Sequence, residues 1–356
     1  MAYTTINKST AHFDTKLYSG NGGTQTITGL GFQPDMTWVK SRNTTDGHTL
    51  QDAVRGFGST TKLSPYDTSG ENNANGGSYG NYGYQSASTS DGFTMVAGSN
   101  PGQNNKSGNN YVAWNWKANG SGSANTDGAT ASTVSVNNTA GFSIVKWTGT
   151  SGNTTVGHGM NTAPVFTIVK NYGSNGMNWI VYHKDISPDY AVKLNTTDAQ
   201  SNSNNYWQST APTNSVLTFT GNTASNANGY NMIAYCFAEK TGYSKIGSYK
   251  GNQNADGTFV YTGFKPAFAL SKDITSAGEN WFIHDNKRNT FNPTNTYLRP
   301  NTTNGDGTAH HYDFYSNGFK NKYAGGSLNS SGRTYIYMAF AEAPLVGSNN
   351  VPCTAR

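Results

Sequence analysis

Three stretches of the chain share one pattern: GLGFQPDMTWVK (29–40), GHGMNTAPVFTIVK (157–170) and YTGFKPAFALSK (261–272). Each contains a proline, with large apolar residues two and four positions later and a lysine six positions later. Apolar residues at alternate positions are typical of a half-buried β-strand, and proline fits the first residue of a strand, where no ladder N–H is needed. The pattern therefore predicts an equivalent strand after Pro34, Pro164 and Pro266.

Other features recur at matching distances from these prolines. An aromatic-x-Gly motif precedes them by 16, 17 and 17 residues, and a strand-like stretch with aromatic residues follows them by 82, 73 and 74 residues. In each such stretch, large residues occupy one face and mostly small residues the other, as expected when one face fills a core and the other lets a second layer approach closely. These closing stretches are YVAWNWKA (111–118), MIAYCFAE (232–239) and IYMAFAEA (336–343). The sequence therefore predicts three diverged copies of one module.

The repeat sets the expected domain organisation. Many short strands separated by Gly- and Asn-rich turns favour an all-β fold of three β-sandwich or jelly-roll modules with little helix. The expected boundaries are an N-terminal arm (1–10), module one (11–118), a Gly/Ser/Asn linker (119–131), module two (132–240), module three (241–345) and a C-terminal tail (346–356).

Composition excludes several classes of function. The 24 basic and 19 acidic residues give a formal charge of +5 without any basic run, which argues against nucleic-acid binding. No stretch resembles a signal peptide or a membrane span, so we expect synthesis in a cytosol and no membrane insertion. The Gly/Asn/Tyr-rich, Glu-poor surface fits a protein that works outside a cell after release by lysis. Two cysteines, Cys236 and Cys353, cannot form a disulfide framework and are expected to be free thiols.

The charged residues give no catalytic motif. A sandwich glycosidase needs two carboxylates about 5–10 Å apart, and no matching string of acids occurs. Two acids recur with an arginine three residues later, Asp52 with Arg55 and Asp285 with Arg288. We interpret each pair as a structural clamp that holds a turn; a binding or catalytic role is the alternative. Copy two reads HKDI (183–186) and has no such arginine.

The histidines show no metal-ligand spacing. His183 and His284 follow the repeated tryptophans at similar distances, which indicates packing roles, and His310-His311 lies in a polar loop. We therefore expect neither a metal site nor a cofactor.

Recognition by aromatic residues in loops is the functional interpretation that remains. Flat aromatic rings match sugar faces and amides match sugar hydroxyls. The alternative is that these rings only anchor their loops to the sandwich. The candidate binding residues are Tyr79, Tyr82, Tyr84, Tyr206, Trp207, Tyr312 and Tyr315.

The ensemble of YTTINKST, LYSGNGGTQTITGLGFQPDMTWVKSR, YVAWNWKA, IAYCFAE, TYIYMAFAEAP and NNVPCTAR resembles virion-associated proteins of tailed bacteriophages, especially marine ones. Those proteins have repeated β-sandwich domains of unknown function, likened to concanavalin-A-type lectins and glucanases. The glucanase catalytic string is missing here, so no catalytic residue is carried over.

The resemblance implies a non-enzymatic virion surface protein, either a tail fibre or spike or a capsid decoration or head fibre. It further implies contacts with other virion proteins or a host-surface glycan, and a homo-oligomer, with a trimer favoured. Assembly in the host cytoplasm and release by lysis would follow. The alternative is a tail-associated glycan depolymerase on a glucanase-like sandwich.

Overall fold

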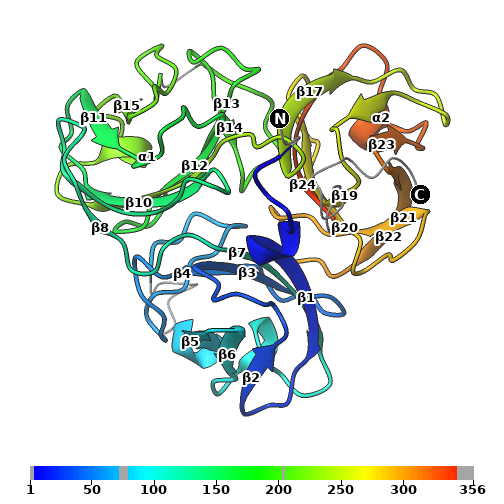
Figure 1. The fold of residues 1–356 in the computed structure, drawn as a ribbon, viewed down its shortest axis with the longest axis horizontal. Helices are drawn as coiled ribbons and strands as arrows, with labels where there is room; N and C mark the ends of the chain where they lie inside the picture. The colour runs from blue at the N-terminus through cyan, green and yellow to red at the C-terminus, as the bar shows by residue number, and fades with distance from the viewer. Residues whose placement is uncertain (1–3, 72–78, 203–204, 343–356) are drawn as a thin grey trace.

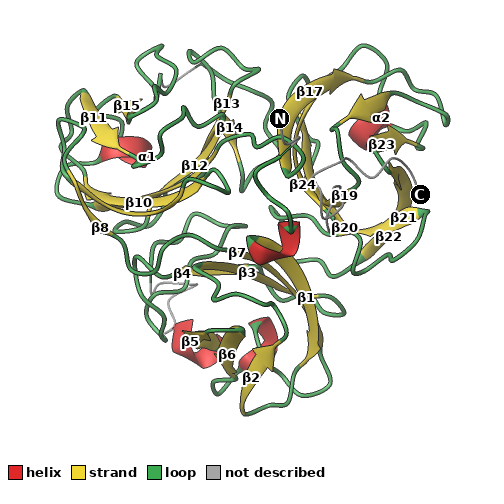
Figure 2. Ribbon diagram, in the orientation of Figure 1, coloured by secondary structure: helices red, strands yellow, loops and turns green. Residues whose placement is uncertain are grey.

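The computed structural model describes residues 4–71, 79–202 and 205–342. Strands hold 42% of the described residues and helices 5%, which confirms the all-β class (Figure 2). In the described part of the chain, no helix combines the length and apolar character needed to cross a bilayer. The helical turns are η1 (Ser9–Ala11), η2 (Tyr79–Tyr82), η3 (Pro101–Gln103), α1 (Thr223–Asn226) and α2 (Gly326–Asn329).

Each copy contains a larger antiparallel sheet with the same strand order. In copy one the order is β1 (Phe13–Ser19), β7 (Asn110–Trp116), β3 (Met36–Ser41) and β4 (Thr49–Asp52). In copy two it is β10 (Phe142–Thr148), β16 (Asn231–Phe237), β12 (Phe166–Asn171) and β13 (Ile180–His183), extended at its ends by β14 (Val192–Lys193), β9 (Ser132–Asn137) and β8 (Ser123–Asn125). In copy three it is β17 (Ser244–Lys250), β24 (Thr334–Ala341), β19 (Pro266–Asp273) and β20 (Trp281–Asp285).

A second, smaller sheet completes each copy as a sandwich. It contains β2 (Thr24–Thr28), β6 (Gly92–Val96) and β5 (Tyr84–Thr89) in copy one, and β11 (Thr154–Gly157) and β15 (Val216–Phe219) in copy two. In copy three it contains β18 (Phe259–Tyr261), β23 (Gly318–Asn321), β22 (Gly307–Tyr315) and β21 (Thr294–Tyr297). The small residues of the closing strands, such as Ala113, Ala234 and Ala339, lie in the local core between the two sheets of their copy.

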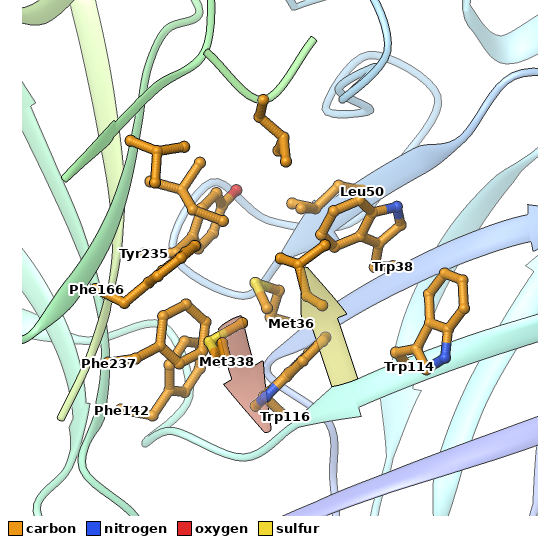
Figure 3. Packing of buried hydrophobic residues seen from close by; sticks show 14 of the residues in the cluster. Met36, Trp38, Leu50, Trp114, Trp116, Phe142, Phe166, Tyr235, Phe237 and Met338 are labelled. Carbon is orange, nitrogen blue, oxygen red and sulfur yellow. The ribbon is translucent and has the colours of Figure 1, made fainter. Parts of the chain in front are cut away.

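The large residues of the closing strands form one core that all three copies share. Figure 1 shows the three lobes around a common centre with their larger sheets turned towards it, and Figure 3 shows the side chains meeting there. Trp116, Phe237 and Phe340 occupy equivalent positions on β7, β16 and β24, and their ring centroids are 5.9–6.1 Å apart with edge-to-face geometry. The copies are therefore joined through a continuous hydrophobic core, in addition to the local core between the two sheets of each copy.

The strands predicted after the three prolines are present. Strand β19 begins at Pro266, while β3 and β12 begin two residues after Pro34 and Pro164. Their alternate large residues are buried as expected, with Met36, Trp38, Phe166, Ile168, Phe268 and Leu270 at most 3% exposed.

The predicted linker and arm differ from the expectation. Ser123–Asn125, inside the expected linker 119–131, pairs with β9, so this segment belongs to the sheet of copy two. The described part of the N-terminal arm packs on its own chain: Ile6 lies in the shared core, and the Ser9 hydroxyl donates a hydrogen bond to the Glu342 carbonyl at 2.8 Å. The C-terminal tail, with Cys353, lies outside the described residues.

Candidate functional site

The Asp52–Arg55 pair closes the turn after strand β4. Arg55 Nε donates to Asp52 Oδ2 at 2.6 Å, and Asp52 Oδ1 accepts the backbone amides of Val54 and Arg55 at 3.1 and 2.9 Å. Arg55 Nη1 also donates to Glu71 Oε1 at 2.8 Å. Both side chains of the pair are almost fully buried. This geometry is that of a clamp that holds a turn.

The Asp285–Arg288 pair repeats this arrangement in copy three. Arg288 Nε donates to Asp285 Oδ2 at 2.7 Å, and its Nη1 donates to Asp306 Oδ1 at 3.0 Å. The amides of Lys287 and Arg288 donate to Asp285 Oδ1. The guanidinium is fully buried, so the two contacts expected from the sequence spacing are present and closed to a ligand.

Each clamp receives one more hydrogen bond, from a different copy. The Tyr235 hydroxyl of copy two donates to Asp52 Oδ2 at 2.8 Å, and the Trp114 indole of copy one donates to Asp285 Oδ2 at 3.1 Å. Tyr235 and Trp114 hold the same position in their closing strands, because each pairs with the residue four after its repeated proline. The clamps therefore also bind neighbouring copies together.

Copy two has an uncharged version of the clamp. His183 pairs with Phe166 across the strands, as Asp52 pairs with Met36, so His183 replaces the acid. Ile186 stands where the arginine would be and lies in the shared core. Burial lowers the pKa of His183 to about 4, and its Nδ1 accepts the Asp185 amide at 3.1 Å.

The expectation that His183 and His284 occupy similar places is wrong, because their positions in the repeat differ by one residue. His284 pairs with Ala269, on the opposite face of its strand, and its Nε2 lies 3.1 Å from His311 Nδ1 in the local core of copy three. Burial lowers the pKa of His311 to about 3, so this pair of rings is neutral and structural. His310 instead lies 2.8 Å from Asp313.

A ring of hydrogen bonds crosses the three junctions. The Trp179 and Trp281 indoles donate to the carbonyls of Ser64 and Lys193 in the preceding copy, at 3.0 and 2.9 Å. His48 Nε2 lies 3.0 Å from the Arg299 carbonyl and closes the ring between copies one and three. The three accepting residues are equivalent in the repeat. Each comes directly after a residue that pairs with the fourth strand of the larger sheet of its copy, which is β4, β13 or β20.

The repeated lysines are also structural. Lys40, Lys170 and Lys272 are fully buried, and their ammonium groups donate to backbone carbonyls. Burial lowers their pKa values to about 8, 7 and 8 respectively.

The junction between copies three and one contains a cavity of about 350 Å³. Arg42 lines it and donates from Nε to Asp306 Oδ2 at 2.8 Å. Arg299 lies over the rings of Phe282 and Tyr297, 5.3 and 5.1 Å from their centroids, and donates from Nη2 to the Tyr297 hydroxyl at 3.2 Å. The full lining is Arg42, Asn43, Thr44, Thr45, Tyr297, Arg299, Asn304, Gly305, Asp306 and Gly307.

The loop 299–306 reaches this place because glycine allows a close backbone approach. A Cβ on Gly305 would lie 2.5 Å from the Arg42 carbonyl oxygen, which also accepts the Asp306 amide at 2.6 Å. The loop therefore lies directly against the end of β3.

A second cavity, of about 460 Å³, lies where copy two passes into copy three. Its lining includes Glu239, Lys245 and the exposed ring of Tyr261. The Glu239 carboxylate is ion-paired with Lys184 and Lys245 at 2.7 and 3.2 Å.

The comparison with known families gives a match that covers all three copies. Residues 8–344 match the family described as Domain of unknown function (DUF7483). The chain belongs to this family. No curated protein matches the chain.

In this member of the family, three of the predicted binding aromatics are not accessible. Tyr206, Trp207 and Tyr312 are at most 7% exposed. Trp207 packs on Tyr182 and Phe219, and Tyr312 is hydrogen-bonded inside the core of copy three. The expectation that these three rings offer a binding surface is wrong. Tyr206 and Trp207 anchor their loop in the local core of copy two, and Tyr312 belongs to strand β22 and lies in the local core of copy three.

The other predicted aromatics are more accessible. Tyr82 and Tyr84 are half-buried, and the Lys62 ammonium lies 5.5 Å from the centroid of the Tyr82 ring. Tyr315 is 39% exposed. The side chain of Tyr79 lies outside the described part of the structure.

No metal centre is formed by the residues that the structure describes. Within 4–71, 79–202 and 205–342, no three His, Cys, Asp or Glu side chains gather closely enough to hold a metal ion.

The arginine-lined cavity was missed by sequence reasoning. Its two arginines are 257 positions apart in the chain, and the equivalent positions of the other copies hold other residues. The two arginines lie at one junction only because copies three and one are neighbours in the folded chain, which the structure reveals.

Proposed function

We propose that this protein binds glycans without cleaving them, as a surface component of a tailed bacteriophage particle. The observation that carries the binding part is the cavity between copies three and one. It combines two guanidinium groups with amide and hydroxyl side chains, which are the donors and acceptors that recognise sugars.

The carboxylates at the two cavities favour binding over hydrolysis. Asp306 is shared by Arg42 and Arg288, and Glu239 by Lys184 and Lys245. A glycosidase needs one carboxyl group to donate a proton and a second to act as nucleophile or base. Carboxylates held between two cations are poorly suited to either role, so a depolymerase remains the less favoured alternative.

The particle part of the proposal rests on the sequence resemblance to phage virion proteins. A rigid unit with a shared core suits a component of a particle surface, with other virion proteins as partners. A homo-oligomer, with a trimer favoured by the resemblance, belongs to the same proposal, as does assembly in the host cytoplasm and release by lysis.

Incubation with host-surface polysaccharide tests the proposal. We expect retention of the protein on immobilised polysaccharide and no increase in reducing ends over hours. New reducing ends would favour the depolymerase, and the absence of both retention and cleavage would contradict a role in glycan recognition.

A further inference from the structure

The cavity between copies three and one has unused positive charge. Arg299 makes no ion pair within the described residues, and its Nη1 donates no hydrogen bond there. Arg42 uses only Nε, towards Asp306, so its two Nη groups also lack partners in the described part of the chain. Asp306 is itself shared with the buried Arg288. A ligand that enters this cavity therefore meets free guanidinium donors.

The orientation of Arg299 is fixed before any ligand arrives. Its guanidinium lies against the Phe282 and Tyr297 rings and is hydrogen-bonded to the Tyr297 hydroxyl. Its backbone carbonyl lies 3.0 Å from His48 Nε2 of copy one. A planar guanidinium held in this way loses little side-chain entropy when it binds a carboxylate, and its paired N–H groups match the two carboxylate oxygens.

The equivalent junctions lack this pair of arginines. The residue two positions after the repeated lysine is Arg42 in copy one, Tyr172 in copy two and Ile274 in copy three. The residue whose carbonyl receives the indole or imidazole is Arg299 in copy three, Ser64 in copy one and Lys193 in copy two. The shared fold therefore does not require the two arginines.

The rest of the lining indicates a sugar rather than a simple anion. Asn304 and Thr45 are exposed at the rim, and Asn43 is exposed beside them with its Oδ1 accepting the Asn110 amide. Amides and hydroxyls match vicinal sugar hydroxyls, and a volume of about 350 Å³ is within the usual range of small-ligand sites.

From these observations we infer that the cavity binds a carboxylate-bearing sugar, with the carboxylate on Arg299 and Arg42 and the hydroxyls on the rim residues. This inference rests on the proposed glycan-binding function and names its ligand class as uronate-containing, acidic polysaccharide.

Titration calorimetry with trigalacturonate tests the inference, with the neutral galactotriose as comparison. Because each substitution removes charge-assisted hydrogen bonds to the carboxylate, we expect Arg299→Gln and Arg42→Gln each to weaken binding of trigalacturonate by about tenfold or more. The matched control is Lys193→Gln, which removes one positive charge at the equivalent position of copy two and should change the affinity less than about twofold.

Several results would contradict the inference. Equal affinity of Arg299→Gln and the unchanged protein, with Arg42→Gln also unaffected, would overturn the inference. Equal binding of the acidic and neutral trisaccharides would overturn it while leaving glycan binding intact. Binding of neither trisaccharide would contradict both the inference and the proposed function. Full competition by equimolar acetate or sulfate would show that the cavity is a simple anion site.

Thermal unfolding of every variant excludes loss of the fold as the cause of weaker binding. If Arg299→Gln does not fold, Arg42→Gln still tests the inference.

Discussion

The hydroxyl of Tyr235 donates a hydrogen bond to Oδ2 of Asp52 at 2.8 Å, although the two residues are 183 positions apart. The bond is buried and joins the closing strand of copy two to the turn clamp of copy one. Trp114 and Asp285 form the equivalent bond between copies one and three. The clamps that hold turns inside the copies are thus also the points at which the copies are joined.

We expect Tyr235→Phe to lower the free energy of unfolding by about 1–3 kcal/mol, because a buried carboxylate loses one of its donors. Urea unfolding measures this change. Tyr230→Phe, at a ring that is 46% exposed, is the control and should leave the midpoint unchanged. Equal midpoints for both variants would show that the bond between copies contributes nothing.

The uncharged clamp of copy two predicts a rescue experiment. His183→Asp should destabilise the protein by about 3–5 kcal/mol. Ile186 stands where the arginine would be, and Met338, which holds the position of Tyr235 and Trp114 in its own closing strand, has no hydrogen-bond donor to offer the new carboxylate. Adding Ile186→Arg and Met338→Tyr restores the partners found in copy one and should recover a large part of the loss. A triple variant no more stable than His183→Asp would contradict the assigned equivalence.

The shared core predicts that one copy does not fold alone. Residues 11–118 without the rest would expose Phe13, Trp38, Trp114 and Trp116, which are at most 2% exposed in the whole chain. We expect this fragment to be unfolded or self-associated by analytical ultracentrifugation and near-UV circular dichroism. A monodisperse, natively packed monomer would mean that the central core is dispensable.

Acid should destabilise the fold through its buried histidines. Burial lowers the pKa of His183 to about 4 and that of His311 to about 3, below the ordinary value of about 6.5. The unfolded chain binds these protons below about pH 6.5 while the folded chain does not, so the free energy of unfolding should fall as the pH falls through that window. Urea unfolding at pH 7, 6 and 5 measures the slope.

One variant isolates the contribution of one histidine. His183→Gln should reduce the slope with pH, because the amide that replaces the buried imidazole does not titrate. A slope in His183→Gln equal to that of the unchanged protein would show that this imidazole does not take part.

The repeat could be predicted from sequence because it depends on local patterns. Alternation after Pro34, Pro164 and Pro266 and the large and small faces of the closing strands are visible along the chain. Asp52 and Arg55 are close in sequence, so their contact also followed from spacing. The equivalence of His183 and His284 was wrong by one residue. Equivalent positions are defined by strand pairing, which cannot be read from the sequence.

The binding site depends on contacts between distant segments. Tyr206 and Trp207 look like loop aromatics, and only the packing on Phe219 shows that Trp207 is an anchor. Arg42 and Arg299 meet because the third copy closes the ring against the first. No local pattern reports such a junction.

A crystal structure of the protein with trigalacturonate tests the central claim most directly, namely that one of three equivalent junctions serves as a binding site. We predict one ligand at the junction of copies three and one, with a carboxylate within about 3 Å of the guanidinium groups of Arg299 and Arg42. Ligand at the junctions that contain Ser64 or Lys193, or on the Tyr82 and Tyr84 loop with this cavity empty, would contradict the account.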